Sequence, residues 1–280
     1  MIEDPSELDF LLPEIMEDYN AGAEFFSTHV LPEYVILEDL QLQGRDLALF
    51  LTFTCVTNHI HDGTQDSKKT DGPNGLWRIC ANLWKQHRWT FLPEKLVDED
   101  RKDELVELFG SLELMDHRDP DWWYRNAQTL GTKWDGDPRN LLEAPMIESD
   151  TVDDPSYDAP AIEKAVQSND FPALGGEKIR PLWLRLMHEE VHELRRIEEV
   201  HIPVDFHIVG MTNRLHSNGK QFSQYDADDK ETLRTFWQLL CQRNELVPVQ
   251  VDKPLWLLNK YWEDGGRVYV AKKLGDLRKR

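Results

Sequence analysis

Cysteine is scarce in this chain of 280 residues, and its three copies, Cys55, Cys80 and Cys241, lie far apart. This spacing provides no disulfide framework, no Cys-x-x-Cys pair and no set of four ligands for an iron–sulfur cluster. We therefore expect a reducing, cytoplasmic environment and a protein that needs no cofactor.

Long apolar runs are also absent. No stretch reaches the roughly 20 apolar residues that a helix needs to cross a bilayer. The first 20 residues carry seven acidic and no basic side chains, which is the opposite of a signal peptide. We expect a soluble protein with no membrane partner.

Basic residues are outnumbered, with 32 Lys and Arg against 52 Asp and Glu and a formal net charge of −20. Such a charge argues against a nucleic-acid partner, which is usually bound by a basic face. High-salt cytoplasms favour acidic surfaces on proteins of every function, however, and their salt screens the repulsion. The charge therefore indicates either a ligand class or a halophilic, archaeal habitat.

Only the C-terminal end is locally positive, since residues 259–280 carry seven basic and three acidic side chains. A basic end can bind phosphates without reading sequence, although such ends are also commonly just solvated. The candidates are Lys272, Lys273, Arg278, Lys279 and Arg280.

The apolar pattern predicts an all-α fold. The segment at 76–87 has apolar residues at helical spacing, and 119–134 begins with Asp-Pro, a helix-start signal. The stretch at 46–60 is a buried helix or a strand, and its length favours a helix. We expect a long helix from about Glu177 to Glu199, while "GRVYVAKKL" near the C-terminus could form a strand.

Two segments, "FPALGGEKI" and "IPVDFHIVGMTNRL", contain candidate catalytic residues. Gly175 and Gly176 permit a tight turn directly before a helix, and free N–H groups at a helix start can hold a phosphate. Lys178 follows them, and a neutral lysine amine is a nucleophile that forms Schiff bases. Asp205 could manage protons or stabilise positive charge. By residue type alone, Asp205 is also a preferred N-cap and Lys178 a solvated side chain.

Together, the two segments resemble the helix-hairpin-helix (HhH-GPD) DNA glycosylase superfamily, in particular endonuclease III and the archaeal 8-oxoguanine glycosylases. The matching positions are Gly176 and Lys178 in the hairpin and Val204, Asp205, His207, Ile208, Arg214 and Leu215 in the second motif. The likeness spans about residues 46–260. The hairpin reads Ala-Leu-Gly-Gly instead of Pro-Gly-x-Gly, Gly210 stands where many members carry Arg, and the iron–sulfur cysteines are absent.

The resemblance implies a two-lobed helical fold. One lobe would contain the middle helices, about residues 76–200, and end in the hairpin and long helix. The other would combine residues 1–75 with residues 201–262, followed by a basic tail at 263–280.

The resemblance further implies a monomeric base-excision repair enzyme that acts on double-stranded DNA and flips a damaged, possibly oxidised base out of the stack. Lys178 would attack the sugar carbon and form a Schiff base, which gives AP-lyase activity, and Asp205 would be the essential carboxylate. Gly175 and Gly176 would grip phosphate without reading sequence. The further DNA contacts would be Asn58, His59 and His207.

Two alternatives remain open. "HEEVH" at 188–192 has the HExxH pattern of zinc hydrolases, with His188 and His192 as ligands and Glu189 as general base. A third ligand is missing, because Glu198 and Glu199 follow too closely on the same predicted helix. The other alternative is a catalytically silent DNA-binding or interaction protein that has kept the glycosylase fold.

Overall fold

The computed structural model describes residues 7–58, 73–112, 117–146, 154–215 and 221–279. Their regular secondary structure is helical and includes no strand, so the predicted all-α class is confirmed. Contacts divide the chain into two compact units. We call Pro32–Ile197 the middle unit, and Met1–Leu31 with Glu198–Arg280 the terminal unit.

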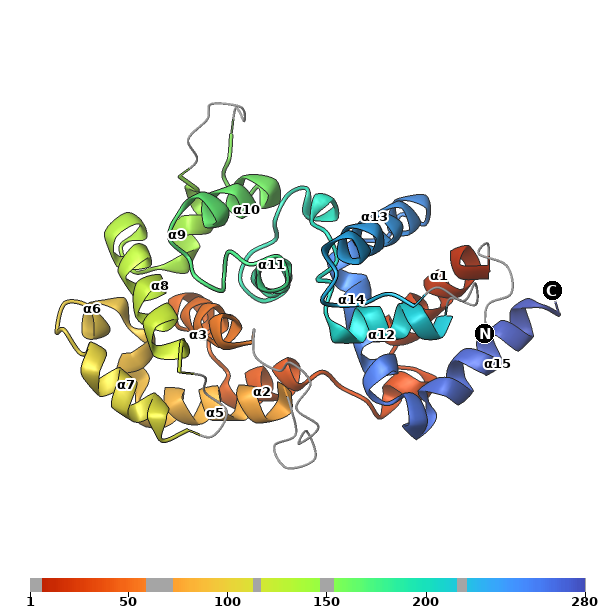
Figure 1. Cartoon of the computed structure of the whole chain (residues 1–280), viewed down its shortest axis with the longest axis horizontal. Helices are drawn as coiled ribbons and strands as arrows, with labels where there is room; N and C mark the ends of the chain where they lie inside the picture. The colour runs from red at the N-terminus through yellow and green to blue at the C-terminus, as the bar shows by residue number, and fades with distance from the viewer. Residues whose placement is uncertain (1–6, 59–72, 113–116, 147–153, 216–220, 280) are drawn as a thin grey trace. The chain divides into compact units, whose positions relative to one another are not determined.

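The middle unit contains most of the helices (Figure 1). They are α2 (Pro32–Leu40), α3 (Gly44–Thr57), α5 (Pro73–Gln86), η2 (Arg88–Phe91), α6 (Pro93–Leu96), α7 (Lys102–Gly110), α8 (Asp119–Trp134), α9 (Pro138–Glu143), α10 (Ala159–Ser168) and α11 (Ile179–Glu190). The segment predicted to start a helix with Asp-Pro forms α8 with the expected bounds.

Helix α3 is the centre of the middle unit. Every side chain from Leu47 to Thr57 is buried, as expected for a helix that is apolar on all sides. Helices α5, α8, α9 and α11 pack around it. Two of its threonines are hydrogen-bonded inside the unit. Thr52 Oγ1 donates to the Ala48 carbonyl and accepts from Trp183 Nε1 at 2.9 Å, and Thr57 Oγ1 donates to the Thr54 carbonyl at 2.9 Å. The ambiguous segment at 46–60 is therefore a helix, as its length indicated.

The packing of α3 explains why the middle unit begins at Pro32 and not after residue 75. The resemblance places residues 1–75 with the C-terminal helices, whereas α2 and α3 belong to the same compact unit as α5 to α11. The reason is physical, because the buried surface of α3 is covered by those middle helices.

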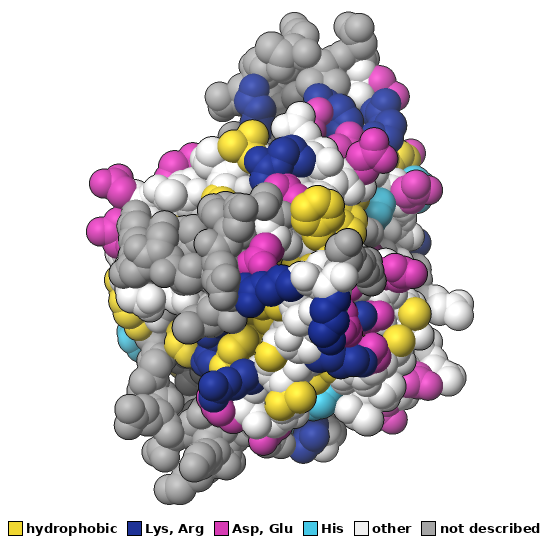
Figure 2. Space-filling model, turned by 90° about the vertical axis from the view of Figure 1, so that its right-hand side faces the viewer, with side chains coloured by type: hydrophobic (Ala, Val, Ile, Leu, Met, Phe, Trp, Pro, Cys, Tyr) yellow, Lys and Arg dark blue, Asp and Glu magenta, His cyan; other side chains and the backbone are white. Residues whose placement is uncertain are grey.

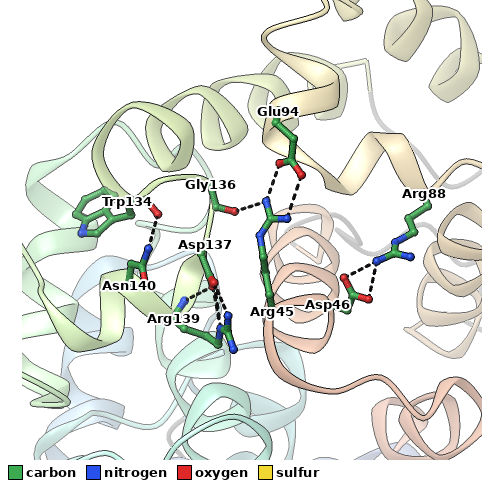
Figure 3. Close-up of polar contacts among 9 residues, drawn as sticks. All are labelled: Arg45, Asp46, Arg88, Glu94, Trp134, Gly136, Asp137, Arg139 and Asn140. Atoms are coloured by element: carbon green, nitrogen blue, oxygen red, sulfur yellow. Dashed lines mark hydrogen bonds and ion pairs between the residues drawn. The ribbon is translucent and has the colours of Figure 1, made fainter.

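A polar cluster fixes the end of α3 to its neighbours (Figure 3). The Arg45 guanidinium donates to both carboxylate oxygens of Glu94, at 3.0 and 2.6 Å, and to the Gly136 carbonyl at 3.0 Å. Next to it, Arg88 donates to Asp46 at 2.6 Å. These charges are paired and half-exposed or exposed, so we interpret the cluster as structural.

The terminal unit combines both ends of the chain. Its elements are α1 (Glu7–Asn20), η1 (Glu24–Ser27), α12 (Phe206–Leu215), α13 (Ala227–Arg243), α14 (Pro248–Lys260), η4 (Trp262–Gly266) and α15 (Arg267–Leu277). A short turn, η3 (Ile197–Glu199), lies at the unit boundary. Helix α14 packs on α12, α13 and α1. Within the described residues, no helix is both long and apolar enough to cross a membrane.

The C-terminal segment is helical. "GRVYVAKKL" is part of helix α15 rather than a strand, and α15 packs along α1. Its basic side chains pair with the acidic N-terminal segment: Lys272 with Glu24 at 2.9 Å, Lys273 with Asp18 at 2.5 Å and Arg278 with Glu7 at 2.6 Å. The charge asymmetry between the chain ends is thus used within the fold, and Arg280 lies outside the described residues.

The face drawn in Figure 2 is consistent with this pairing, because several dark blue Lys and Arg side chains lie beside magenta Asp and Glu. Lys279 also has an acidic neighbour, Asp276, at 3.3 Å. A patch for phosphate would require these basic groups to leave their carboxylates.

The pair between Asp18 and Lys273 is the least exposed of these contacts, with side-chain exposures of 16% and 14%. Asp18 also accepts a hydrogen bond from the Tyr269 hydroxyl at 2.7 Å. We expect Asp18→Ala to lower the free energy of unfolding by about 1–3 kcal/mol, because both partners lose their acceptor. Urea unfolding should show this loss, whereas Glu17→Ala, which removes an exposed acid from the same helix, should stay within about 0.5 kcal/mol. Equal effects would contradict the pairing.

All three cysteines are buried. Burial raises the pKa of Cys55, and it raises the pKa of Cys80 and of Cys241 to about 12. A thiol acts as a nucleophile only as the thiolate, so none of the three is suited to nucleophilic catalysis at neutral pH.

Candidate functional site

Helices α10 and α11 of the middle unit are joined by a turn at residues 169–178 that requires glycine. A Cβ on Gly176 would lie 2.9 Å from the Ala173 carbonyl oxygen, and one on Gly175 would lie 3.1 Å from that of Phe171. Both distances are shorter than ordinary contacts, and the opposing atoms are backbone. The tight turn that the two glycines predicted is therefore present.

The N–H groups of these glycines are used inside the turn. Gly175 N–H donates to the Phe171 carbonyl, and Gly176 N–H donates to the Ala173 carbonyl, both at 2.8 Å. The N–H groups of Gly175 and Gly176 are therefore not available to bind a phosphate in this conformation. The two glycines shape the turn, and a phosphate contact of the turn would use other groups.

Arg180 clamps the turn onto α10. Its Nε donates to Glu163 Oε1 at 2.8 Å, and its Nη1 donates to the Gly175 carbonyl at 2.5 Å. The Gln167 side-chain oxygen accepts from the same guanidinium in the amide orientation that satisfies both groups. Arg180 is only 7% exposed. Sequence reasoning missed this residue, because its partners are on another helix.

Lys178 lies directly before α11, and its Nζ donates to the Asn58 carbonyl at 3.2 Å. Asn58 follows the last residue of α3, so the structure brings together two candidates that are 120 positions apart. The acceptor is a neutral oxygen. By contrast, Lys85 and Lys273 hold carboxylates. Among the described residues, this carbonyl is the acceptor that the structure gives for Lys178 Nζ. His59 lies outside the described residues.

Asp205 is the N-terminal cap of α12 in the terminal unit. Its Oδ1 accepts hydrogen bonds from the backbone N–H of His207, at 2.7 Å, and of Ile208, at 3.0 Å. This is the capping role that the residue type indicated. The cap also holds the carboxylate in a fixed direction. Lys178 and Asp205 thus belong to different units, and their pairing stays a prediction.

His207 is the first residue of a polar network between α12 and α14. Its Nδ1 lies 3.1 Å from Asn259 Nδ2, and its ring packs on Trp256 with the centroids 4.6 Å apart. Asn259 Oδ1 in turn accepts from Arg214 Nε at 3.0 Å. Burial lowers the pKa of Arg214, whose guanidinium lies 5.0 Å from the ring of Trp262.

Gly210 explains how the Asn259 side chain fits against α12. A Cβ at position 210 would lie 2.6 Å from Asn259 Oδ1. Glycine inside a helix costs up to about 1 kcal/mol relative to alanine and often marks close packing. That signal could have indicated a buried partner for α12, although not which one.

The long helix expected from Glu177 to Glu199 is wrong, and with it the geometry of the HExxH pattern. Helix α11 ends at Glu190, so His192 lies beyond the helix instead of one turn after His188. His188 Nδ1 accepts from the Leu194 N–H at 2.9 Å, while the His192 ring stacks on Tyr157 at 3.8 Å. The two imidazoles therefore have separate structural contacts.

Glu189, the general base of that pattern, also has a structural contact. The Tyr34 hydroxyl donates to Glu189 Oε2, and burial raises the pKa of Tyr34. Across the described part of the chain, no group of three or more His, Cys, Asp or Glu side chains is placed to hold a metal ion.

The described residues thus define an all-helical protein of two compact units. The middle unit has a lysine at a glycine turn, and the terminal unit has an aspartate at a helix start. No family model, curated protein or solved structure matches the chain.

Proposed function

We propose that the protein is a DNA base-excision glycosylase with AP-lyase activity, with the two-lobed fold of the helix-hairpin-helix superfamily. The observation that carries the proposal is the pair α10 and α11 with its glycine turn, which delivers Lys178 to the start of α11 on a neutral acceptor. Asp205 and His207, held at the start of α12, supply the second motif of the resemblance.

Lys178 would act as the nucleophile. Its neutral Nζ adds to C1′ of a nucleotide that has been flipped out of the duplex, and the bond from C1′ to the base breaks. The base leaves with the bonding electrons and takes a proton. Opening of the sugar ring and loss of a proton from Nζ then give a Schiff base at C1′, which is the intermediate that a lyase uses.

Asp205 would supply the negative charge for this step. A carboxylate fixed by two backbone N–H groups stabilises positive charge that develops at the sugar carbon, or accepts a proton from the attacking amine. Both actions need the carboxylate near the extruded nucleotide, which the pairing with Lys178 predicts.

The acidic composition restricts the conditions of DNA binding. A chain with a net charge of −20 repels a polyanion at low ionic strength. We propose that it works in a high-salt cytoplasm, where repulsion beyond about 3 Å is screened at 1 M salt. Assays should therefore include molar KCl.

The test is release of damaged bases from duplexes that each contain one lesion, with 8-oxoguanine, uracil and an abasic site as the first three. Borohydride is added to reduce any Schiff base to a stable amine. Base release or a covalent adduct on at least one duplex is the expected result. Duplex binding without either product would favour the silent DNA-binding alternative. Stoichiometric bound zinc with neither DNA binding nor turnover would overturn the proposal in favour of a hydrolase.

A further inference from the structure

The glycine turn between α10 and α11 is held by side chains that lie outside it. The backbone carbonyls of Asp170, Pro172 and Gly175 each accept a hydrogen bond from the side chain of a helical residue. The first two bonds come from α8, and the third comes from Arg180 of α11. The N–H groups of Gly175 and Gly176 bond inside the turn, so the turn is already formed in the free protein.

Thr129 and Asn126 supply the two bonds from α8. Thr129 Oγ1 donates to the Asp170 carbonyl at 2.7 Å, and Asn126 Nδ2 donates to the Pro172 carbonyl at 2.9 Å. The two donor residues are buried, with exposures of 7% and 0%. Asn126 Nδ2 also donates to the Trp122 carbonyl at 2.6 Å. Because both acceptors are carbonyl oxygens, the amide nitrogen must face them, and the orientation of the Asn126 side chain is fixed.

Two other contacts between α8 and this segment are exposed. Arg125 Nε donates to the Asp170 carboxylate at 3.0 Å, and Lys133 donates to the Asn169 side chain. Exposed contacts of long charged side chains contribute little to stability, because water competes for the same groups. The position of the turn therefore depends mainly on the two buried bonds from α8.

The turn in its turn sets the position of Lys178. The lysine follows Gly175 by three residues and stands directly before α11. At its other end, Nζ donates to the Asn58 carbonyl at 3.2 Å. A nucleophile reacts only when it can approach its target to about 3–3.5 Å in the correct direction. A displaced turn would move the Lys178 backbone and with it the origin of that approach.

We propose that Thr129 and Asn126 are positioning residues that hold the glycine turn and thereby present Lys178 for attack on the sugar carbon. The effect on the nucleophile rests on the proposed function. The holding of the turn does not rest on it, because it follows from hydrogen bonds within the middle unit.

The first measurement is amide hydrogen exchange of the free protein, followed by NMR. Thr129→Val keeps the shape of the side chain and removes the donor, so the Leu174 and Gly175 N–H groups should exchange about fivefold faster or more, as expected for the loss of one hydrogen bond. Asn126→Leu, which removes the bond to Pro172, should have the same effect. Thr129→Ser keeps the hydroxyl and should exchange like the wild-type protein.

The matched control for exchange is Thr132→Val. It makes the same chemical change on an exposed face of α8, where the Thr132 hydroxyl bonds within its own helix. Exchange in the turn should stay at the wild-type rate in this variant. Wild-type exchange in both Thr129→Val and Asn126→Leu would overturn the holding of the turn by α8.

The second measurement is the rate of borohydride-trapped adduct formation at a saturating concentration of abasic duplex, corrected for the folded fraction of each variant. Thr129→Val should lower this rate about tenfold or more, since a displacement of about 1 Å can cost up to about 100-fold. Duplex affinity should stay within about twofold, because an orientation of the nucleophile is lost and not a DNA contact. Thr129→Ser should restore the rate, and Thr132→Val should not change it.

The outcomes separate this role from the proposed function. Faster exchange with an unchanged adduct rate, or a loss of affinity in place of rate, would refute the positioning role while the glycosylase proposal stands. A wild-type protein that forms no adduct would refute the positioning role together with the proposed function. The exchange rates would still decide whether α8 holds the turn.

Discussion

Lys178→Ala is expected to abolish the borohydride-trapped adduct and to lower the rate of strand cleavage at an abasic site by about 10³-fold or more. Loss of a nucleophile removes the covalent route, and only the catalysis supplied by binding and electrostatics remains. Duplex affinity should change little, because Lys178 is proposed to act as the nucleophile and not to hold the DNA in place. Single-turnover cleavage and filter binding measure the two quantities separately.

The matched control is Lys133→Ala. Lys133 also belongs to the middle unit and also donates to a neutral oxygen, that of the Asn169 side chain. Its removal takes away the same charge, so trapping should persist at the wild-type level. Similar losses in the two variants would indicate that lysine charge, and not a Schiff base at position 178, supports the activity.

Glu33→Ala should cause the largest loss of stability, about 3–5 kcal/mol in the free energy of unfolding. Glu33 on α2 accepts from Arg185 on α11 at 2.5 Å, with side-chain exposures of 7% and 2%. Removal of one partner leaves a buried charge without its counter-ion, which is far more costly than the pair is worth. Urea unfolding followed by tryptophan fluorescence gives the difference.

Two further variants distinguish this effect from a general sensitivity of α2. Asp39 is also on α2, and Asp39→Ala removes its exposed pair with Lys85 of α5, which should cost about 0–1 kcal/mol. The double variant Glu33→Leu with Arg185→Met should recover most of the loss, since a well-packed apolar pair often replaces a buried ion pair without penalty. A Glu33→Ala cost below 1 kcal/mol would be inconsistent with the burial of this pair.

The local part of the fold could be predicted from the sequence. Apolar spacing, together with an Asp-Pro start, is a property of neighbouring residues, and it gave α8 its bounds and α3 its type. Gly175 and Gly176 indicated a tight turn for the same reason, because close backbone approach needs a missing Cβ within the turn itself.

The end of α11 could not be predicted in this way. No glycine or proline stops the helix after Glu190. The chain leaves the helix because Arg196 returns to the buried cap of α10, where its guanidinium holds both oxygens of Asp158 at 2.7 and 2.6 Å. The backbone of Arg195 bonds to the residues on either side of that cap, because its N–H donates to the Tyr157 carbonyl and its carbonyl accepts from the Ala159 N–H. These contacts are tertiary, so the sequence pattern continues where the helix does not.

The same distinction applies to the candidate site. Asp205 could be recognised as a cap from its own position, since its partners are two and three residues away. The acceptor of Lys178 is on a helix 120 positions earlier, and the Asn259 amide lies 52 positions after His207. Neither contact has a local signature, and only Gly210 indicates that something packs closely against α12.

The most direct test of the central claim is mass spectrometry of the protein after borohydride reduction on an abasic duplex, with the modified peptide sequenced. We expect one reduced sugar adduct, located on Lys178, and a signal that disappears in Lys178→Ala. An adduct on any other lysine or on the N-terminal amine would contradict it. The absence of an adduct under conditions in which the protein binds the duplex would contradict it equally.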